Sequence, residues 1–453
     1  MLFNTLTYLL FLPIVFVLYW SARSLRGQNL VVVVASMVFY GWWSMPCLGL
    51  MVATCLANFI IAQGLRTNGP GLGNRRRLLL IAALVVNFGV LGVFKYFDFF
   101  SQSLSSLLAL VGFRADMPTL RLVLPVGISF YTFQLSGYII DCYRGTLQPT
   151  RSLLRFMAFV SFFPQLVAGP IERGSKLMPQ FEQRRRFSEP LATEGMRLLL
   201  WGLVKKMLVA DNCAHQVDFI FANYQTVGTP TLWLGALYFT FQIYGDFSGY
   251  SDMAVGSARL LGIDISRNFD KPYLATSLPH FWRRWHMTLM GWFRDYVYIP
   301  LGGNRHGRVR REVNLFIVFL LSGLWHGSNW TFVLWGLYHA LLYRLPVKRL
   351  TFVVVMVGWV IFRAEDVGMA AGYLSGMFSP EGLTSLSCSR MPLLPISLLT
   401  LTEWRMGKAD HPFQWADKGW QGRQWVRMAI YLVVFALTVL LGGETVQFIY
   451  FQF

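Results

Sequence analysis

Long apolar stretches, most of them nearly free of charge, recur along the whole of this 453-residue chain. An α-helix needs ~20 apolar residues to cross a bilayer, where it satisfies its own backbone hydrogen bonds. Hydrophobic residues make up 55% of the chain and charged residues 14%, whereas soluble domains carry about 25% charged residues. We therefore expect an all-α polytopic transmembrane protein, a single integral membrane domain over residues 1–453, with about 11 spans. The apolar stretches are 3–20, 29–45, 46–64, 78–99, 120–140, 192–211, 231–250, 312–326, 329–344, 349–363, 366–378 and 424–442.

The net charge of +18 comes from 40 basic and 22 acidic residues. In a soluble protein such a charge would favour nucleic acid as the partner. Here the basic residues lie in short loops between apolar stretches, where they orient the chain and contact anionic lipid headgroups. We therefore expect membrane lipid, and not nucleic acid, as a partner, and the basic face can also attract an anionic substrate.

Basic residues also predict the orientation, because cytoplasmic loops are enriched in Lys and Arg. Arg23 and Arg26 follow the first stretch and Arg75–Arg77 follow the third, so the N-terminus is expected outside. The run 156–170 is apolar, yet basic residues follow it at 184–186. Because the run contains two prolines, which break helices, we expect a re-entrant segment that enters and leaves on the inner side.

The segment 259–311 is too polar to span and is expected on the inner face. Within it, residues 281–301 have the period of an amphipathic interfacial helix, with Arg283 and Arg294 together on its wet side. Such a stripe is as often plain packing as a binding surface. His286 is unusual, because it puts a titratable group on the apolar side. The apolar side comprises Trp282, Trp285, His286, Leu289, Trp292, Phe293 and Tyr296.

His326 is the strongest candidate for chemistry. A helix from Glu312 to His326 rises only ~21 Å, short of the ~30 Å hydrocarbon core, so His326 should lie at membrane depth. An ionisable group there is costly and is by default a functional candidate. Burial favours neutral imidazole, the form that a general base needs. Gly323 and Gly327 remove side-chain bulk and are expected to let a partner or a substrate approach. From the residues alone, a histidine that only hydrogen-bonds between helices is an equally good interpretation.

Other polar residues are weaker candidates. Asp246, Asp252 and Asp264 lie near the inner end of an apolar stretch, where they could line a tunnel or, as we favour, pair with the arginines that follow. His339 favours a structural role, and His411 has no partner that the sequence identifies. The five cysteines are scattered without metal-ligand spacing, so no metal site is expected.

A series of segments in order along the chain resembles the membrane-bound O-acyltransferase family. Within it, the chain is most similar to the bacterial alginate O-acetyltransferase membrane subunits, which are related to the D-alanine transfer protein of teichoic acid synthesis. The stretch 379–423 departs from the family pattern in being short and irregular. The matching segments are Leu124–Phe133, Phe163–Ile171, Gly245–Met253, Phe281–His286, Arg294–Asn304, Gly323–Gly327 and Phe448–Phe453.

The resemblance implies a ring of membrane helices around a central tunnel, with the catalytic histidine at His326 and a second polar site residue at His286. It also implies an acyl group taken from a cytoplasmic thioester, such as acetyl-CoA, and passed through the tunnel. A separate periplasmic acetyltransferase then modifies an extracytoplasmic polysaccharide, as in alginate biosynthesis.

We therefore expect an O-acetyltransferase of the bacterial inner membrane with no metal and no tightly bound cofactor. His326 would act as base, His286 would orient the acceptor or stabilise the oxyanion, and Arg283, Arg284 and Arg294 would attract the donor. Transfer of D-alanine or another acyl group to a cell-envelope polymer remains an alternative. A transporter is disfavoured because the two halves show no repeat, and a scaffold that recruits a glycan-modifying enzyme remains possible.

Overall fold

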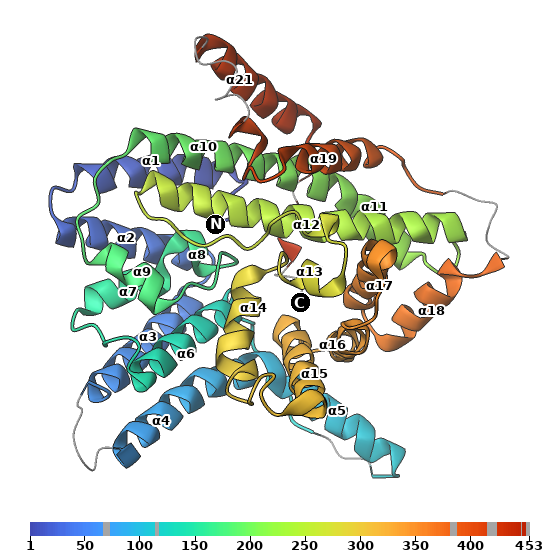
Figure 1. Cartoon of the computed structure of the whole chain (residues 1–453), viewed down its shortest axis with the longest axis horizontal. Coiled ribbons are helices and arrows are strands. Elements are labelled where there is room, and N and C mark those ends of the chain that lie inside the picture. The colour runs from blue at the N-terminus through green and yellow to red at the C-terminus, as the bar shows by residue number, and fades with distance from the viewer. Residues whose placement is uncertain (67–72, 114–116, 381–386, 415–423, 445, 450–453) are drawn as a thin grey trace. The chain divides into compact units, whose positions relative to one another are not determined.

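The computed structural model of the protein describes residues 1–453 apart from 67–72, 114–116, 381–386, 415–423, 445 and 450–453. In these described residues the regular elements are helices, joined by turns and loops (Figure 1). The all-α class is thus confirmed, and each expected apolar stretch lies at least partly on a helix. The chain divides into two compact units, residues 1–188 with 261–265 and residues 189–260 with 266–453. One integral domain remains a prediction.

In the first unit, polar side chains cap the N-termini of helices and hydrogen-bond neighbouring helices to each other. Thr5, Ser24 and Ser44 cap α1, α2 and α3, each side chain accepting a backbone N–H of the first turn. Asn58 of α3 and Asn87 of α4 exchange hydrogen bonds of 2.6 and 3.0 Å. Amide pairs of this kind join helices where lipid offers no hydrogen bonds. The elements are α1 (Leu6–Ser21), α2 (Leu25–Gly41), α3 (Met45–Gly64), α4 (Gly73–Leu91), the π-helix η1 (Gly92–Tyr96), α5 (Phe97–Leu110), α6 (Ile128–Arg144), α7 (Leu153–Ser161), α8 (Phe163–Leu166), α9 (Gly174–Leu177) and η2 (Met178–Phe181).

The expected re-entrant run 156–170 does not form a spanning helix. It is divided between α7 and α8, with a break at Phe162. The 9 residues of α7 rise only ~14 Å, less than half of a hydrocarbon core. The run is buried within its unit. Its side of the membrane remains a prediction.

Among the described residues, the helices at Met45–Gly64, Gly73–Leu110 and Gln424–Leu441 have the length and composition to cross a membrane. Leu6–Ser21, Leu25–Gly41 and Trp330–Leu342 are apolar but shorter. The expected total of about 11 spans, which rests on apolar stretches of the sequence, therefore remains a prediction.

The second unit is built around α12, a 32-residue helix that is buried along most of its length. Helix α12 packs against α10, the π-helix η3, α11 and α17. The stretch 379–423, which departs from the family pattern, contains α19 and η8 in its described part. The elements are α10 (Glu189–Leu203), η3 (Val204–Asp211), α11 (Asn212–Ala222), α12 (Thr229–Leu260), η4 (Pro272–Leu274), α13 (Leu278–Trp282), α14 (Met287–Phe293), η5 (Arg294–Tyr298), α15 (Gly307–His326), α16 (Trp330–Leu342), η6 (Lys348–Leu350), α17 (Thr351–Arg363), α18 (Val367–Met377), α19 (Leu393–Met406), η8 (Pro412–Gln414) and α21 (Gln424–Leu441).

Glycines bring the backbones of α10 and α12 into contact. A Cβ atom added to Gly202 would lie 2.5 Å from the carbonyl oxygen of Gly249, and one added to Gly249 would lie 2.7 Å from that of Gly202. Gly195 and Gly256 face each other in the same way, at 2.7 and 2.5 Å. Small residues are what allow membrane helices to approach this closely. This contact fixes α12, whose Phe247 ring lies 4.7 Å from that of His286.

Gly249→Ala is expected to destabilise the protein by about 1–3 kcal/mol, because the new methyl group meets a backbone carbonyl that cannot move away cheaply. Gly49→Ala is the matched control, since Gly49 is also helical and an added Cβ has nothing within 4 Å. This control should be neutral or slightly stabilising, because alanine favours helix. Denaturant unfolding of the detergent-solubilised protein measures both, and equal shifts would contradict the close-contact explanation.

Candidate functional site

His326 ends α15 inside a cluster of aromatic rings. The residue is 4% exposed, and its ring centroid lies 5.0 Å from that of Trp325, 5.2 Å from Trp335 and 5.3 Å from Phe362. The helix stops here because Gly327 is extended and Asn329 starts α16, its side chain accepting the Thr331 N–H at 3.1 Å. The chain thus holds one imidazole at a helix end with aromatic faces around it.

Of the two expected partners of Gly323 and Gly327, the one that approaches them in the structure is a neighbouring helix, α16. A Cβ atom on Gly323 would lie 2.2 Å from the carbonyl oxygen of Phe332, and one on Gly327 would lie 2.0 Å from the Phe332 ring. Helix α16 therefore fills the space beside these glycines. Their role is to let α16 pack closely against α15, which brings Trp335 onto the His326 ring.

His286 lies where the helix is interrupted, so the expected continuous helix over 281–301 is wrong. Its backbone is left-handed, with φ +41°, and it separates α13 from α14. Tertiary hydrogen bonds replace those of the helix: the Met287 N–H donates to the Asn268 carbonyl at 2.9 Å, and the Asp270 N–H donates to the Arg284 carbonyl at 3.0 Å. Strained backbone at a buried polar residue is typical of functional sites.

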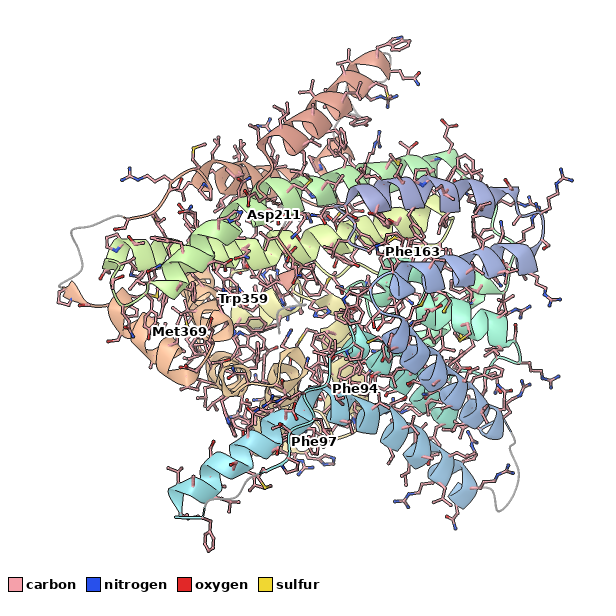
Figure 2. All side chains as sticks on the ribbon, turned by 180° about the vertical axis from the view of Figure 1, so that it is seen from behind. Phe94, Phe97, Phe163, Asp211, Trp359 and Met369 are labelled. Atoms are coloured by element: carbon pink, nitrogen blue, oxygen red, sulfur yellow. The ribbon has the colours of Figure 1, made fainter. Side chains whose placement is uncertain are left out.

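The expected division of residues 281–301 into a buried side and an exposed side is confirmed, although the segment is not one continuous helix. The aromatic residues of its apolar side and His286 are buried, whereas Arg283 and Arg294 are exposed. The buried rings join the core of the second unit, where Trp359, labelled in Figure 2, lies 4.8 Å from Trp285 and 5.8 Å from Trp335 by ring centroids. The aromatic stripe is therefore packing around the histidines.

His286 and His326 both lie against the same residue, Trp325. The Trp325 ring centroid lies 5.5 Å from that of His286 and 5.0 Å from that of His326. His339 is buried nearby, with its ring 4.8 Å from Trp335 and 4.9 Å from Trp282. His339 thus sits among aromatic rings, which supports its structural interpretation. Two imidazoles around one indole form the candidate active site.

Burial lowers the pKa of His286 to about 3, from an ordinary value near 6.5. Between these values the unfolded chain binds a proton that the folded chain does not, so the stability contributed by neutral His286 is full above pH ~6.5 and falls as the pH drops toward 3.

His286→Asn should remove this pH-dependent loss of stability, which amounts to up to about 1.4 kcal/mol per pH unit. Asn does not titrate, and it tolerates left-handed backbone. Unfolding measured from pH 7 to 4 checks this. His215→Asn, at an exposed histidine, should keep the wild-type pH dependence, and the same dependence in both variants would contradict the assignment.

Two of the arginines expected to attract the donor, Arg284 and Arg294, have different hydrogen-bond and ion-pair partners. The Arg294 guanidinium pairs with Asp295 at 2.7 Å. Arg284 lies 4.0 Å from Asp270 and donates to the Lys271 carbonyl at 3.4 Å. Donor attraction by these residues remains a prediction.

Two aspartates have different partners from those we favoured. Asp246 pairs with Lys206 at 2.8 Å and Asp252 pairs with Lys205 at 2.6 Å, so both lie against consecutive lysines of η3 and not against the later arginines. Asp264 belongs to the first unit, where its backbone exchanges hydrogen bonds with the Gln180 side chain at 2.8 and 2.9 Å.

His411 does have a partner, which the sequence did not reveal. Its Nε2 lies 2.7 Å from Oε2 of Glu194, and the other carboxylate oxygen of Glu194, Oε1, accepts from Arg197 at 2.6 Å. Arg197 in turn donates to the Tyr431 hydroxyl at 3.0 Å. The network joins α10, α21 and the segment near η8, and 217 positions separate His411 from Glu194.

Cavities among the described residues of the second unit include a polar one and an apolar one. The polar one, of about 30 Å³, is lined by charged residues such as Lys205, Asp252 and Glu403. The apolar one, of about 510 Å³, is lined by α19 and α21 together with η3. His326 and His286 line neither of them. The central tunnel remains a prediction.

The family model and the similar proteins agree on the family that this chain resembles. Residues 146–346, which include His286 and His326, match the model of the membrane-bound O-acyltransferase family. "Probable alginate O-acetylase AlgI" of Pseudomonas putida is 39% identical over 100% of both chains. The protein of that name from Pseudomonas aeruginosa is 42% identical over 84% of this chain and 75% of its own. "Peptidoglycan O-acetyltransferase" of Helicobacter pylori is 35% identical over 86% of this chain and 82% of its own.

Proposed function

Because this chain belongs to the membrane-bound O-acyltransferase family, we propose that it moves an acetyl group from a cytoplasmic thioester to an extracytoplasmic polysaccharide. The chain is an acyltransferase, and the observation that carries the finer proposal is the 39% identity to an alginate O-acetylase along its whole length. The peptidoglycan relative also transfers acetyl, by its name, which supports acetyl as the cargo. The proposed polymer is therefore a cell-envelope glycan such as alginate.

The proposed setting is the bacterial inner membrane. Basic residues in the loops favour a cytoplasmic face that includes 259–311, with the N-terminus outside. Arg283, Arg284 and Arg294 belong to this face and attract an anionic donor such as acetyl-CoA by long-range steering. A periplasmic acetyltransferase is proposed to complete the transfer to the polysaccharide.

In the proposed reaction, neutral His326 accepts the proton of an acceptor hydroxyl while the hydroxyl oxygen attacks the thioester carbonyl. The new C–O bond forms, the C–S bond breaks, and the imidazolium returns its proton to the leaving thiolate. General base catalysis of this kind contributes about 10²–10⁴-fold to the rate. His286, whose ring centroid lies 5.5 Å from that of Trp325, donates a hydrogen bond to the developing oxyanion or orients the acceptor.

The test is transfer across a membrane by the purified protein. The protein is reconstituted in vesicles with labelled acetyl-CoA on one side and alginate oligosaccharide on the other, with and without a periplasmic acetyltransferase. Label on the polysaccharide or on the partner protein is the expected result. Transfer of labelled D-alanine but not acetyl, or uptake of solute without any thioester, would overturn the proposal.

A further inference from the structure

The last described residues of the chain run into the interior of the second unit. Phe448 and Ile449 are each 1% exposed. Hydrogen bonds tie this segment to η3 and α12: Lys206 donates to the Val446 carbonyl at 3.0 Å, and the Ile449 N–H donates to the Asp246 carboxylate at 2.7 Å. The Gly443 N–H donates to the Met207 carbonyl at 3.2 Å. We call residues 446–449 the docked tail.

Buried charge explains why the tail is held there. The Lys206 ammonium lies 2.8 Å from Asp211, labelled in Figure 2, and 2.8 Å from Asp246, and all three side chains are buried. Two carboxylates share one ammonium here, and such groups are costly to bury unless hydrogen bonds satisfy them. The tail contributes to this cluster, because the Ile449 N–H donates to Asp246 and the Val446 carbonyl accepts from Lys206.

The docked tail also reaches the candidate active site through one side chain. The Phe448 ring lies 4.8 Å from Tyr250 and 6.0 Å from Phe247 by ring centroids. The Phe247 ring lies 4.7 Å from His286. Asp246 and Phe247 are neighbours in α12, so the carboxylate that holds the tail and the ring that touches the histidine move together. A strained residue such as His286 keeps its conformation only where its surroundings fix it.

We propose that Asp246 and Lys206 form a socket for the docked tail, and that Phe448 is a positioning residue that holds His286 through Phe247. The inference rests on the proposed function for its effect on turnover, whereas docking and the state of His286 do not depend on that function. Helix α12 then supplies the ring that contacts His286, and the docked tail fixes that ring.

Turnover gives the first test. Phe448→Ala should lower kcat for acetyl transfer about 10- to 100-fold, as expected for a misplaced site group, and leave the KM for acetyl-CoA unchanged. Phe448→Tyr keeps the ring and should restore most of kcat. Phe413→Ala is the matched control, because Phe413 is a buried ring of the same unit that contacts His411 and Tyr431. An equal fall of kcat in this control, or a fall only in parallel with lost stability, would overturn the proposal.

Two measurements are independent of turnover. Amide hydrogen exchange followed by mass spectrometry should be slow at Ile449 in the wild type and faster in Asp246→Ala, with Asp246→Asn intermediate because its amide oxygen still accepts. Ring NMR of ¹³C-histidine-labelled protein, with the His286 signal assigned from His286→Asn, should show that signal moving in Phe448→Ala and not in Phe413→Ala. An unmoved His286 signal, or equal exchange at Ile449 in wild type and Asp246→Ala, would overturn the inference. If the wild type transfers no acetyl group, the proposed function fails while these two results still decide the docking.

Discussion

Replacing His326 by alanine is expected to lower acetyl transfer by at least ~10²-fold and to leave a folded, membrane-inserted protein. The imidazole is the group proposed to take the acceptor proton, and it ends α15 against Trp325, Trp335 and Phe362. Labelled acetyl-CoA in reconstituted vesicles measures the rate, and gel filtration with thermal unfolding measures the fold.

His339→Ala is the control that separates chemistry from packing. His339 is also buried, lies on the adjacent α16 and touches the same Trp335, so its removal opens a similar cavity. It should lose stability comparable to that lost by His326→Ala while keeping most of its turnover. Full activity of His326→Ala would end the proposal for its role. Equal losses of turnover in the two variants would favour the interpretation in which His326 only packs between helices.

Lys206→Met is expected to destabilise the protein by about 3–5 kcal/mol, because it leaves two buried carboxylates without their counter-ion. Asp211 and Asp246 each lie 2.8 Å from the Lys206 ammonium in the described structure. Urea unfolding of the detergent-solubilised protein measures the change. A triple variant that adds Asp211→Asn and Asp246→Asn should recover much of the loss, since it removes the uncompensated charge.

Lys205→Met is the matched control for this second prediction. Lys205 is the preceding residue of η3 and is equally buried, but the side chain of its partner Asp252 is 20% exposed. Water can therefore solvate the carboxylate that the substitution leaves behind, and the destabilisation should be smaller. A loss as large as that of Lys206→Met would show that any lysine of η3 matters equally, and the buried-charge argument would then be wrong.

The errors in the sequence analysis have a common physical origin. The period of residues 281–301 correctly separated buried aromatic rings from exposed Arg283 and Arg294. It did not reveal the break at His286, because Asn268 replaces the helical hydrogen bond from another part of the chain. Gly323 and Gly327 indicated a close approach by a partner or a substrate, but an absent side chain does not specify which of them fills its place, and here α16 fills it.

The sequence alone determined the class of the protein and its leading catalytic candidate. Its apolar stretches favour helices, because lipid cannot satisfy a peptide group, and a histidine between such stretches is costly enough to be a functional candidate. The tertiary structure alone decided which polar groups meet: His411 with Glu194 over 217 positions, and the Ile449 N–H with Asp246 over 203. Local periodicity reports which side of a helix is apolar, whereas the partner of a buried charge depends on how distant helices pack.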